Sequence, residues 1–176
     1  MIFQTTEIPG AYVLEQQQHQ DARGHFARLW CRRDFESHGL KSNFVQGSIS
    51  HNRYRGTLRG MHYQMTPHSE SKLVQVTRGA IYDVIIDLRV DSPTYKAWFG
   101  LELNPDKGTM LYIPDGCAHG FVTLSDNTDV HYQMTDFFYP ESAAGVRWND
   151  PSFSIRWPVE PVVINERDNQ YEDYVR

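Results

Sequence analysis

Short runs of alternating apolar and polar residues are the strongest local pattern along this chain. Two of them, 72–78 and 80–89, are rich in β-branched residues and meet at Arg78-Gly79, which predicts a β-hairpin. Turn sequences separate further runs of this kind. The expected strands are 43–51, 57–64, 72–78, 80–89, 98–103, 109–113, 120–124 and 129–135. Strands at this spacing predict an all-β fold, either a sandwich or an antiparallel β-barrel.

Helical sequence is scarce. Among the early segments only 33–38 has a helical pattern, and the polar tail 165–176 predicts loops or a brief helical turn. No repeat, low-complexity linker or shift in composition divides the chain, so residues 1–176 are expected to form one domain. A domain of this size buries roughly 70% of the surface of its unfolded chain, so it needs no metal or disulfide to fold.

Charge and hydropathy limit the kinds of partner that the protein is expected to bind. The chain has 17 Lys and Arg against 22 Asp and Glu, a formal charge of −5, and no basic cluster beyond short pairs, so no nucleic-acid partner is expected. No window approaches the roughly 18 apolar residues of a membrane span, and the N-terminus does not resemble a signal peptide. We therefore expect a cytoplasmic protein without a membrane partner. Cys31 and Cys117 are interpreted as free thiols, although two cysteines could also form a single bridge.

A spacing of glycine, proline and histidine in 108–119 is typical of cupins. Gly108, Pro114, Gly116 and His119 fit the second cupin motif, G-x5-P-x-G-x2-H, with Thr123 in place of its final Asn. The motif predicts a cupin or jelly-roll barrel with short peripheral helices.

The first cupin motif is broken in a way that affects metal binding. Gly56 and His62 open it, but Gln64 replaces its second His and Lys72 replaces its Glu. About three His and one carboxylate hold the metal of a cupin, and a glutamine with a cationic lysine cannot replace them. We expect no metal and no cofactor, whereas the Lys72 ammonium could stabilise a developing oxyanion. A metal-dependent cupin oxygenase is the alternative, which stoichiometric bound metal would reveal.

Strand parity indicates which side chains share the barrel interior. On the cupin analogy His62 faces inward, as does Lys72 one strand on. In 129–135, Tyr132 lies on the opposite face from His131 and Gln133, and an inward phenol among apolar neighbours needs a partner such as a substrate atom.

Nearly the whole chain resembles the dTDP-4-dehydrorhamnose 3,5-epimerase family of nucleotide-sugar cupins. The residues that carry the resemblance are 21–24, 44–46, 56–64, 71–74, 113–121, Tyr132, 147–151 and 165–168.

The resemblance implies a reaction and a set of site residues. A nucleoside-diphosphate 4-keto-6-deoxy-hexose, above all dTDP-4-dehydro-6-deoxyglucose, would be inverted at C3 and/or C5. The implied catalytic residues are His62 as base, Asp168 as its partner, Tyr132 as acid and Lys72 near the enolate oxygen. The implied substrate-binding residues are Arg23, Gln46, Arg59, His119 and Arg167. The family also implies a homodimer whose N-terminal segments cross over.

Four positions depart from the pattern of the family. Arg28 and Ala143 stand where many members have glutamate, Phe138 replaces a second tyrosine and Arg167 replaces a common lysine. The sugar and the inverted carbon could therefore differ. A 3- or 5-monoepimerase, a 3,4-ketoisomerase and a catalytically silent sugar-nucleotide-binding cupin are the open alternatives; retention of His62, Tyr132 and Asp168 together argues against the silent protein.

Overall fold

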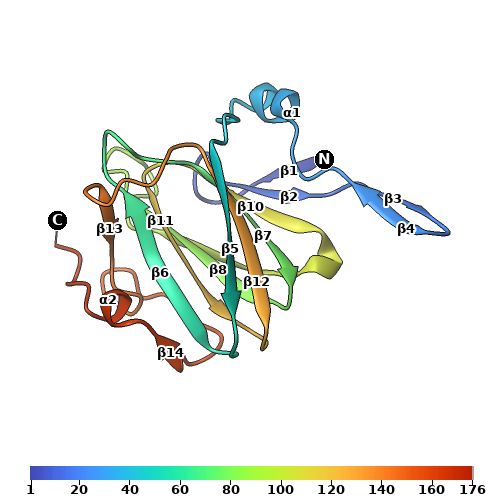
Figure 1. Ribbon diagram of the computed structural model, residues 1–176. Coiled ribbons are helices and arrows are strands. Elements are labelled where there is room, and N and C mark those ends of the chain that lie inside the picture. The colour runs from blue at the N-terminus through green and yellow to red at the C-terminus, as the bar shows by residue number, and fades with distance from the viewer. Residues whose placement is uncertain (176) are drawn as a thin grey trace.

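Two antiparallel sheets face each other and enclose the main core (Figure 1). The computed structural model describes residues 1–175, and Arg176, the last residue of the predicted domain and tail, lies outside them. The first sheet has the order β1 (Ile2–Thr5), β2 (Tyr12–Glu15), β10 (Thr109–Ile113), β7 (Lys72–Arg78), β12 (Thr128–Met134) and β5 (Gln46–Asn52). The second has the order β13 (Ala143–Gly145), β6 (Thr57–Gln64), β11 (Cys117–Thr123), β8 (Ile81–Asp87) and β9 (Trp98–Leu103), and β14 (Val163–Ile164) pairs with β6 in parallel.

The fold confirms the predicted all-β, jelly-roll architecture with short peripheral helices, with one difference. The two sheets are not joined into one closed barrel, because in residues 1–175 no ladder connects β5 to β6. The helical elements are α1 (Arg32–Ser37), the 3-10 turn η1 (Pro105–Lys107) and α2 (Glu166–Asn169). In the described part of the chain no helix is long and apolar enough to cross a membrane.

The strong alternating runs were placed correctly from sequence. Strands 57–64, 72–78, 98–103 and 109–113 match β6, β7, β9 and β10, and the other four predicted strands and the helix are shifted by three residues or fewer at each end. The prediction missed β1, β2, β13 and β14, and also the hairpin of β3 (Gln18–Asp21) and β4 (Gly24–Ala27). These strands have four residues or fewer, too short for a period of two to stand out.

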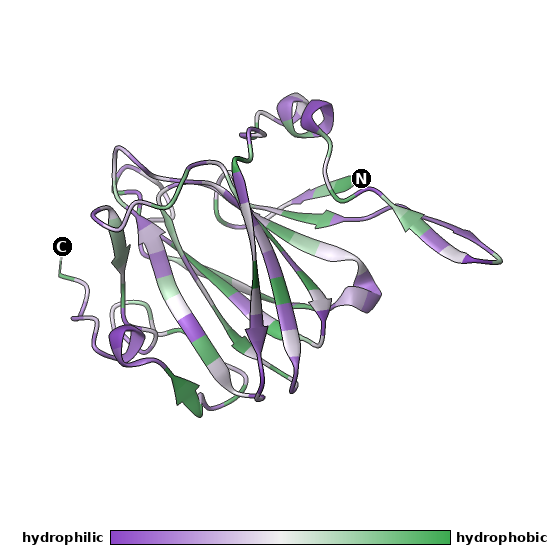
Figure 2. Cartoon of the chain, in the orientation of Figure 1, coloured by the Kyte–Doolittle hydropathy of each residue, from purple (hydrophilic) through white to green (hydrophobic). Residues whose placement is uncertain are grey.

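Alternation places apolar residues between the sheets. Val74 and Val76 of β7, Val130 of β12, Ile85 of β8 and Phe121 of β11 belong to one buried cluster. Figure 2 shows hydrophobic and hydrophilic residues following each other along the strands of the body. A second cluster lies where α1 and the N-terminal segment cover the outer face of the first sheet. The first sheet is thus packed on both faces, against the second sheet and against α1 with the N-terminal segment.

Strands β6 and β11 approach each other closely at two glycines, Gly60 and Gly120. The register between them shifts between His119 and Phe121, and Gly60 has a φ of +114°. A Cβ on Gly60 would lie 2.5 Å from the Cα of Gly120 and 2.6 Å from the carbonyl oxygen of His119. Only a residue without a side chain fits there.

Gly60→Ala is therefore expected to destabilise the protein by about 1–3 kcal/mol, because the new methyl group meets backbone atoms that cannot move aside. Urea unfolding followed by circular dichroism measures the effect. Gly47→Ala on β5 is the matched control, since the nearest atoms to its Cβ lie at an ordinary 3.7 Å. Equal stability of the two variants would contradict the packing argument.

A buried carboxylate closes the turn after β8. Asp87 accepts hydrogen bonds from the Arg89 guanidinium at 2.8 Å and from the hydroxyls of Ser92 and Thr94 at 2.5 and 2.7 Å. Burial opposes the charge, but these hydrogen bonds outweigh burial and lower the pKa of Asp87 from 3.8 to about 2.

This shift makes the turn sensitive to acid. Because the folded-state pKa is the lower one, the stabilisation is complete above about pH 4 and is lost as the pH falls towards 2. We expect Asp87 to account for about 1–2 kcal/mol of the loss in unfolding free energy over that interval, after allowance for screening by water. Asp87→Asn should be less stable at neutral pH and should lose less on acidification, whereas Asp91→Asn, at an exposed position, should follow the parent protein. Denaturant unfolding at a series of pH values tests this, and parallel curves for all three proteins would refute it.

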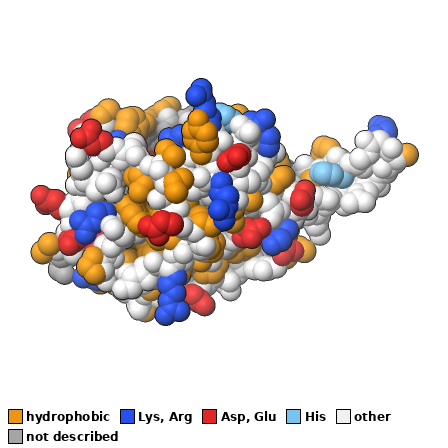
Figure 3. Space-filling view, turned by 90° about the horizontal axis from the view of Figure 1, so that it is seen from below, with side chains coloured by type: hydrophobic (Ala, Val, Ile, Leu, Met, Phe, Trp, Pro, Cys, Tyr) orange, Lys and Arg blue, Asp and Glu red, His pale blue; other side chains and the backbone are white. Residues whose placement is uncertain are grey.

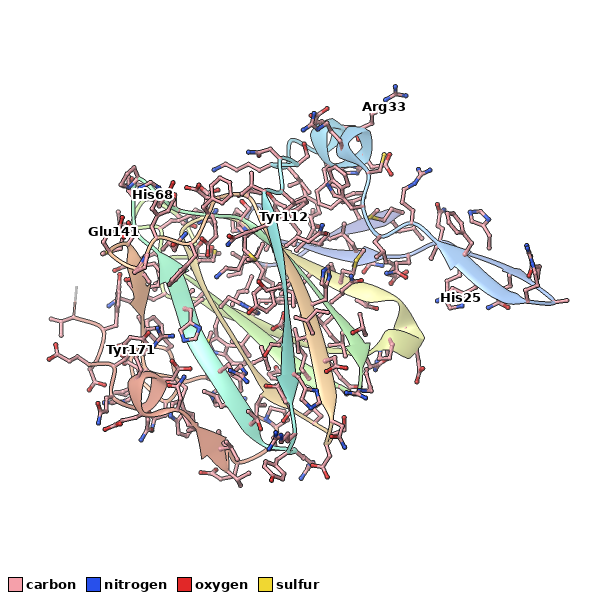
Figure 4. All side chains as sticks on the ribbon, viewed as in Figure 1. His25, Arg33, His68, Tyr112, Glu141 and Tyr171 are labelled. Carbon is pink, nitrogen blue, oxygen red and sulfur yellow. The ribbon has the colours of Figure 1, made fainter. Side chains whose placement is uncertain are left out.

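The hairpin of β3 and β4 extends away from the body as a two-stranded arm (Figure 1). Figure 3 shows the arm standing clear of the main mass of the molecule, and His25 lies on it in Figure 4. Phe26 on the arm is 71% exposed. An isolated two-stranded hairpin is only marginally stable in water, so this arm needs another surface to pack against.

Candidate active site

The outer edge of β6 carries a gap that one carboxylate fills. Gly145 of β13 pairs with His62 of β6, and Ile164 of β14 pairs with Leu58. Between these pairs the Gly60 N–H finds no strand partner and instead donates to Asp168 Oδ2 at 2.9 Å. The buried carboxylate is therefore part of the edge of the sheet.

Local sequence holds Asp168 in this position. Asn165 lies immediately before α2, and its side-chain oxygen accepts a hydrogen bond from the Asp168 N–H at 2.7 Å. This is the N-cap arrangement that asparagine favours. The short helix thereby presents Asp168 to β6 directly after β14 has paired with the same strand.

His62 and Asp168 form a hydrogen-bonded pair. The distance from His62 Nε2 to Asp168 Oδ1 is 2.7 Å, and the Asp168 side chain is completely buried. Burial opposes ionisation of Asp168, but the hydrogen bonds from His62 and Gly60 outweigh it, so the pKa of Asp168 is below its usual value. An ionised Asp168 requires a hydrogen on Nε2, which leaves Nδ1 of His62 as the unprotonated nitrogen of the neutral ring.

His62 lies at the wall of a cavity of about 270 Å³ that both sheets line, and Asp168 is hydrogen-bonded to it. His62 comes from β6 in one sheet, while Lys72 of β7 and Tyr132 of β12 come from the other. A ring-shaped ligand between the sheets would have the imidazole towards one face and the phenol towards the other. The lining residues are Gln46, Ser48, His62, Tyr63, Gln64, Glu70, Lys72, Tyr132, Met134, Phe138, Ala143, Ala144, Arg167 and Tyr171.

Tyr132 has the predicted orientation. Its ring packs against the core between the sheets, and its hydroxyl makes no hydrogen bond with any residue that the structure describes. His131, the next residue back, points to the other face of the sheet, where its Nδ1 is 3.0 Å from Gln75 Nε2. The Tyr132 hydroxyl is therefore available to a ligand.

Lys72 is held by a glutamate that the sequence analysis did not select. Its Nζ lies 3.1 Å from Glu70 Oε1, and the two side chains are only 12% and 8% exposed. The position of the usual cupin carboxylate is thus taken by an ammonium group. Within residues 1–175 no group of three His, Cys, Asp or Glu side chains is arranged to hold a metal ion.

Two of the predicted substrate-binding residues line the same cavity, Gln46 at the start of β5 and Arg167 on α2. The Arg167 guanidinium lies 3.4 Å from His62 Nε2 and 3.6 Å from Asp168 Oδ1, and its side chain is 61% exposed. Its outward reach makes it a cation at the mouth of the cavity.

The other three predicted binding residues lie outside the cavity lining. Arg23 is in the turn of the arm, 89% exposed, in an ion pair with Asp21 at 2.5 Å. Arg59 lies on β6 and donates to Asn52 Oδ1 at 2.7 Å. His119 is paired in register with His62, but its Nε2 is 2.7 Å from the buried Asp83 Oδ1. In one copy of the chain, none of these three residues lines the cavity with His62, Lys72 and Tyr132.

A comparison of the chain with models of protein families shows which family of cupins it belongs to. The family model described as dTDP-4-dehydrorhamnose 3,5-epimerase matches residues 5–175. The chain belongs to the dTDP-4-dehydrorhamnose 3,5-epimerase family. Family membership confirms the expected fold, and the expected class of enzyme, an epimerase.

Individual members of the dTDP-4-dehydrorhamnose 3,5-epimerase family agree in length and shape. The enzyme of Methanothermobacter thermautotrophicus is 39% identical over 173 residues, which cover 97% of this chain and 92% of the relative. The crystal structure of the Elizabethkingia anophelis enzyme has a TM-score of 0.96 at 34% identity and covers 99% of this chain and 96% of its own. That of Bacillus anthracis, with TDP and PPi bound, has a TM-score of 0.95 at 38% identity and covers 98% and 99%.

Glu70, Ser48 and Tyr171 are among the lining residues of this epimerase that were missed from sequence. Glu70 is two residues before Lys72, ahead of the predicted strand 72–78, so strand parity did not reach it. Ser48 follows Gln46 by two residues and could have been found by strand parity. Tyr171 lies beside α2 in Figure 4, with its ring 6.3 Å from that of His62, and no sequence pattern pointed to it.

Asp168→Asn should lower the turnover of this epimerase by about 10²–10⁴-fold, because an amide cannot hold the imidazole in the same tautomer or stabilise its protonated form. Steady-state kinetics with the sugar nucleotide measure the effect. Asp173→Asn is the control: this aspartate lies near the same end of the chain but pairs with Arg147 and not with His62. Similar losses in both variants would show that the effect is not specific to the His62 pair.

Proposed function

We propose that the protein inverts C3 and C5 of dTDP-4-dehydro-6-deoxyglucose by removing and returning the protons next to the C4 ketone. The observation that carries this proposal is the position of His62 and Tyr132 on opposite sheets of one cavity, with Lys72 beside them. Inversion at a carbon needs a base on one face of the sugar and an acid on the other. The two sheets offer these two faces.

The first step is proton transfer to His62. Nδ1 would take the proton from the carbon, and Asp168 would stabilise the resulting imidazolium through its hydrogen bond to Nε2. The electron pair of the broken C–H bond moves to the ketone oxygen, giving an enolate. Lys72 is the cation in the cavity that would stabilise this negative charge. Tyr132 then donates its proton to the opposite face, and solvent restores both groups to their starting forms.

Arginine and glutamine side chains would bind the rest of the substrate. We propose Gln46 and Arg167 in the cavity lining, with Arg59 on β6 and His119 opposite His62 on β11, as contacts for the sugar and the diphosphate. The guanidinium fork matches phosphate oxygens. The Bacillus anthracis relative was crystallised with TDP and PPi, in line with a ligand of this chemistry.

A homodimer would account for Arg23 and for the exposed arm. We propose that the arm packs on a second copy of the chain, covers Phe26 and brings Arg23 of the partner subunit towards the diphosphate. The arm carries an aromatic side chain in water, which favours a covered surface. Light scattering after gel filtration would give a dimer mass for the parent protein and a monomer for Phe26→Asp; a monomeric parent would refute the proposal.

Location remains a prediction. The two cysteines are free thiols, Cys117 buried and Cys31 half-buried, which fits a reducing compartment such as the cytoplasm.

Proton NMR in deuterium oxide with dTDP-4-keto-6-deoxyglucose tests the proposed reaction. Exchange of the hydrogens at both C3 and C5, with inversion, is the expected result. Exchange at one carbon would indicate a monoepimerase, and formation of a 3-keto sugar a ketoisomerase. Binding without exchange would indicate a silent sugar-nucleotide-binding cupin, for which Phe138 and Ala143 in the cavity lining would be the residues to examine. Elemental analysis tests the metal-dependent alternative, which stoichiometric metal would support.

A further inference from the structure

We propose that Glu70 is a positioning residue for the reaction, holding the Lys72 ammonium against the wall of the cavity so that its remaining hydrogens point at the ketone oxygen. This inference rests on the proposed function and extends it to a residue whose role lies outside the base, acid and cation already assigned. The Glu70 carboxylate makes two contacts, one through each of its oxygens.

Both oxygens of Glu70 are occupied by donors. Oε1 accepts from Lys72 Nζ at 3.1 Å, and Oε2 accepts from the amide nitrogen of Gln64. All three side chains line the cavity, and those of Glu70 and Lys72 are almost entirely shielded from water. The two donors contact different oxygens, so a carboxylate fits this position, whereas the NH₂ group of an amide would face one of the donors.

Gln64 fixes the carboxylate in turn. Its Nε2 lies 3.0 Å from the carbonyl oxygens of His68 and Phe137, and its Oε1 accepts from the Tyr139 N–H at 2.7 Å. The amide therefore cannot rotate without breaking contacts to two separate loops. Figure 4 shows His68 and Glu141, which come from these two loops, at the same end of the body. The rigid framework thus runs from the loops through Gln64 and Glu70 to Lys72.

The geometry has a mechanistic consequence. A lysine has a flexible four-carbon stem, and a free ammonium would have to be ordered at each turnover to meet the developing oxyanion. Held by Glu70, it is already in place, which is the condition under which a cation stabilises a transition state most. Because the contact to the ketone oxygen strengthens as the enolate forms, loss of positioning should lower kcat and leave KM nearly unchanged.

The test is a double-mutant cycle between Glu70 and Lys72, read by deuterium exchange over incubations long enough to record slow variants. Glu70→Gln should lower kcat at least tenfold with KM and dTDP binding within about twofold of the parent, whereas the exposed Glu141→Gln should match the parent. In a Lys72→Met background the additional effect of Glu70→Gln should vanish, since a positioning residue acts only through the group it positions.

Each other outcome has a distinct meaning. An active parent protein with an unaffected Glu70→Gln variant, or the same fold loss in both backgrounds, would overturn the positioning role. Loss of kcat accompanied by a lower unfolding midpoint and a weaker dTDP affinity would also overturn it, because that pattern indicates a structural role. Absence of exchange in the parent protein would instead overturn the proposed epimerase reaction itself.

Discussion

Replacing His62 with asparagine is expected to abolish exchange at both C3 and C5, with a loss of at least about 10³-fold in turnover. Asparagine can still occupy the position on β6 and donate to Asp168, but it cannot accept a proton at neutral pH. Deuterium exchange followed by proton NMR measures both carbons in one experiment. The expected loss of turnover is larger than for a substitution on the surface, because every catalytic cycle of the proposed reaction begins with this proton transfer.

His38→Asn is the matched control for this experiment. His38 is the C-cap residue of α1, is exposed, stacks on Phe3 at a ring distance of 3.9 Å and lies outside the cavity lining. Its variant should retain the exchange rate of the parent. If His62→Asn retained exchange at either carbon at the parent rate, another base would have to act there, and the imidazole that neighbours it on β11, His119, would be the first to examine.

Tyr132→Phe should separate deprotonation from inversion. Without the phenolic proton, the acid on the second face is missing, so inversion should fall by about 10²–10⁴-fold. His62 and Lys72 remain in place, so the carbon hydrogens should still exchange with solvent from the face of His62. The expected product is deuterated sugar nucleotide of unchanged configuration, which NMR coupling constants distinguish from the epimer.

Tyr12→Phe provides the comparison for this variant. Tyr12 packs on the outer face of the first sheet, so removal of its hydroxyl should leave both rates unchanged. A Tyr132→Phe protein that still inverts its substrate would show that the returned proton comes from another group or from water. Joint loss of exchange and inversion would instead assign Tyr132 to the deprotonation step.

The alternating runs carried more information than any other feature of the sequence. They placed the long strands because a strand that is buried on one face and packs β-branched residues leaves a period of two in the chain. The same parity put Lys72 and Tyr132 towards the cavity, where the structure has them. It failed for short elements such as β13 and β14, which exist because the edge of β6 offers them hydrogen bonds.

The relation between Arg59 and His62 shows where parity stops being reliable. Strict alternation puts residues three apart on opposite faces, yet Arg59 reaches Asn52 of β5 while His62 faces the cavity that β5 also lines. The register shift opposite Gly60 changes the alternation between them. Nothing local in the sequence reveals that shift, which coincides with the close approach of Gly60 and Gly120 from two separate strands.

The sequence by itself determined the class of fold, because periodicity and motif spacing are properties of neighbouring residues, and its resemblance to the family supplied the candidate base, acid and cation. Only the tertiary structure decided that Asp168 fills the hydrogen-bonding gap on β6, that Glu70 and Gln64 hold Lys72, and that Arg23 stands on an arm away from the cavity. These relations join residues that the chain itself leaves unconnected, such as Gly60 and Asp168. They follow from the need of each buried donor and charge to find a partner once the sheets have formed.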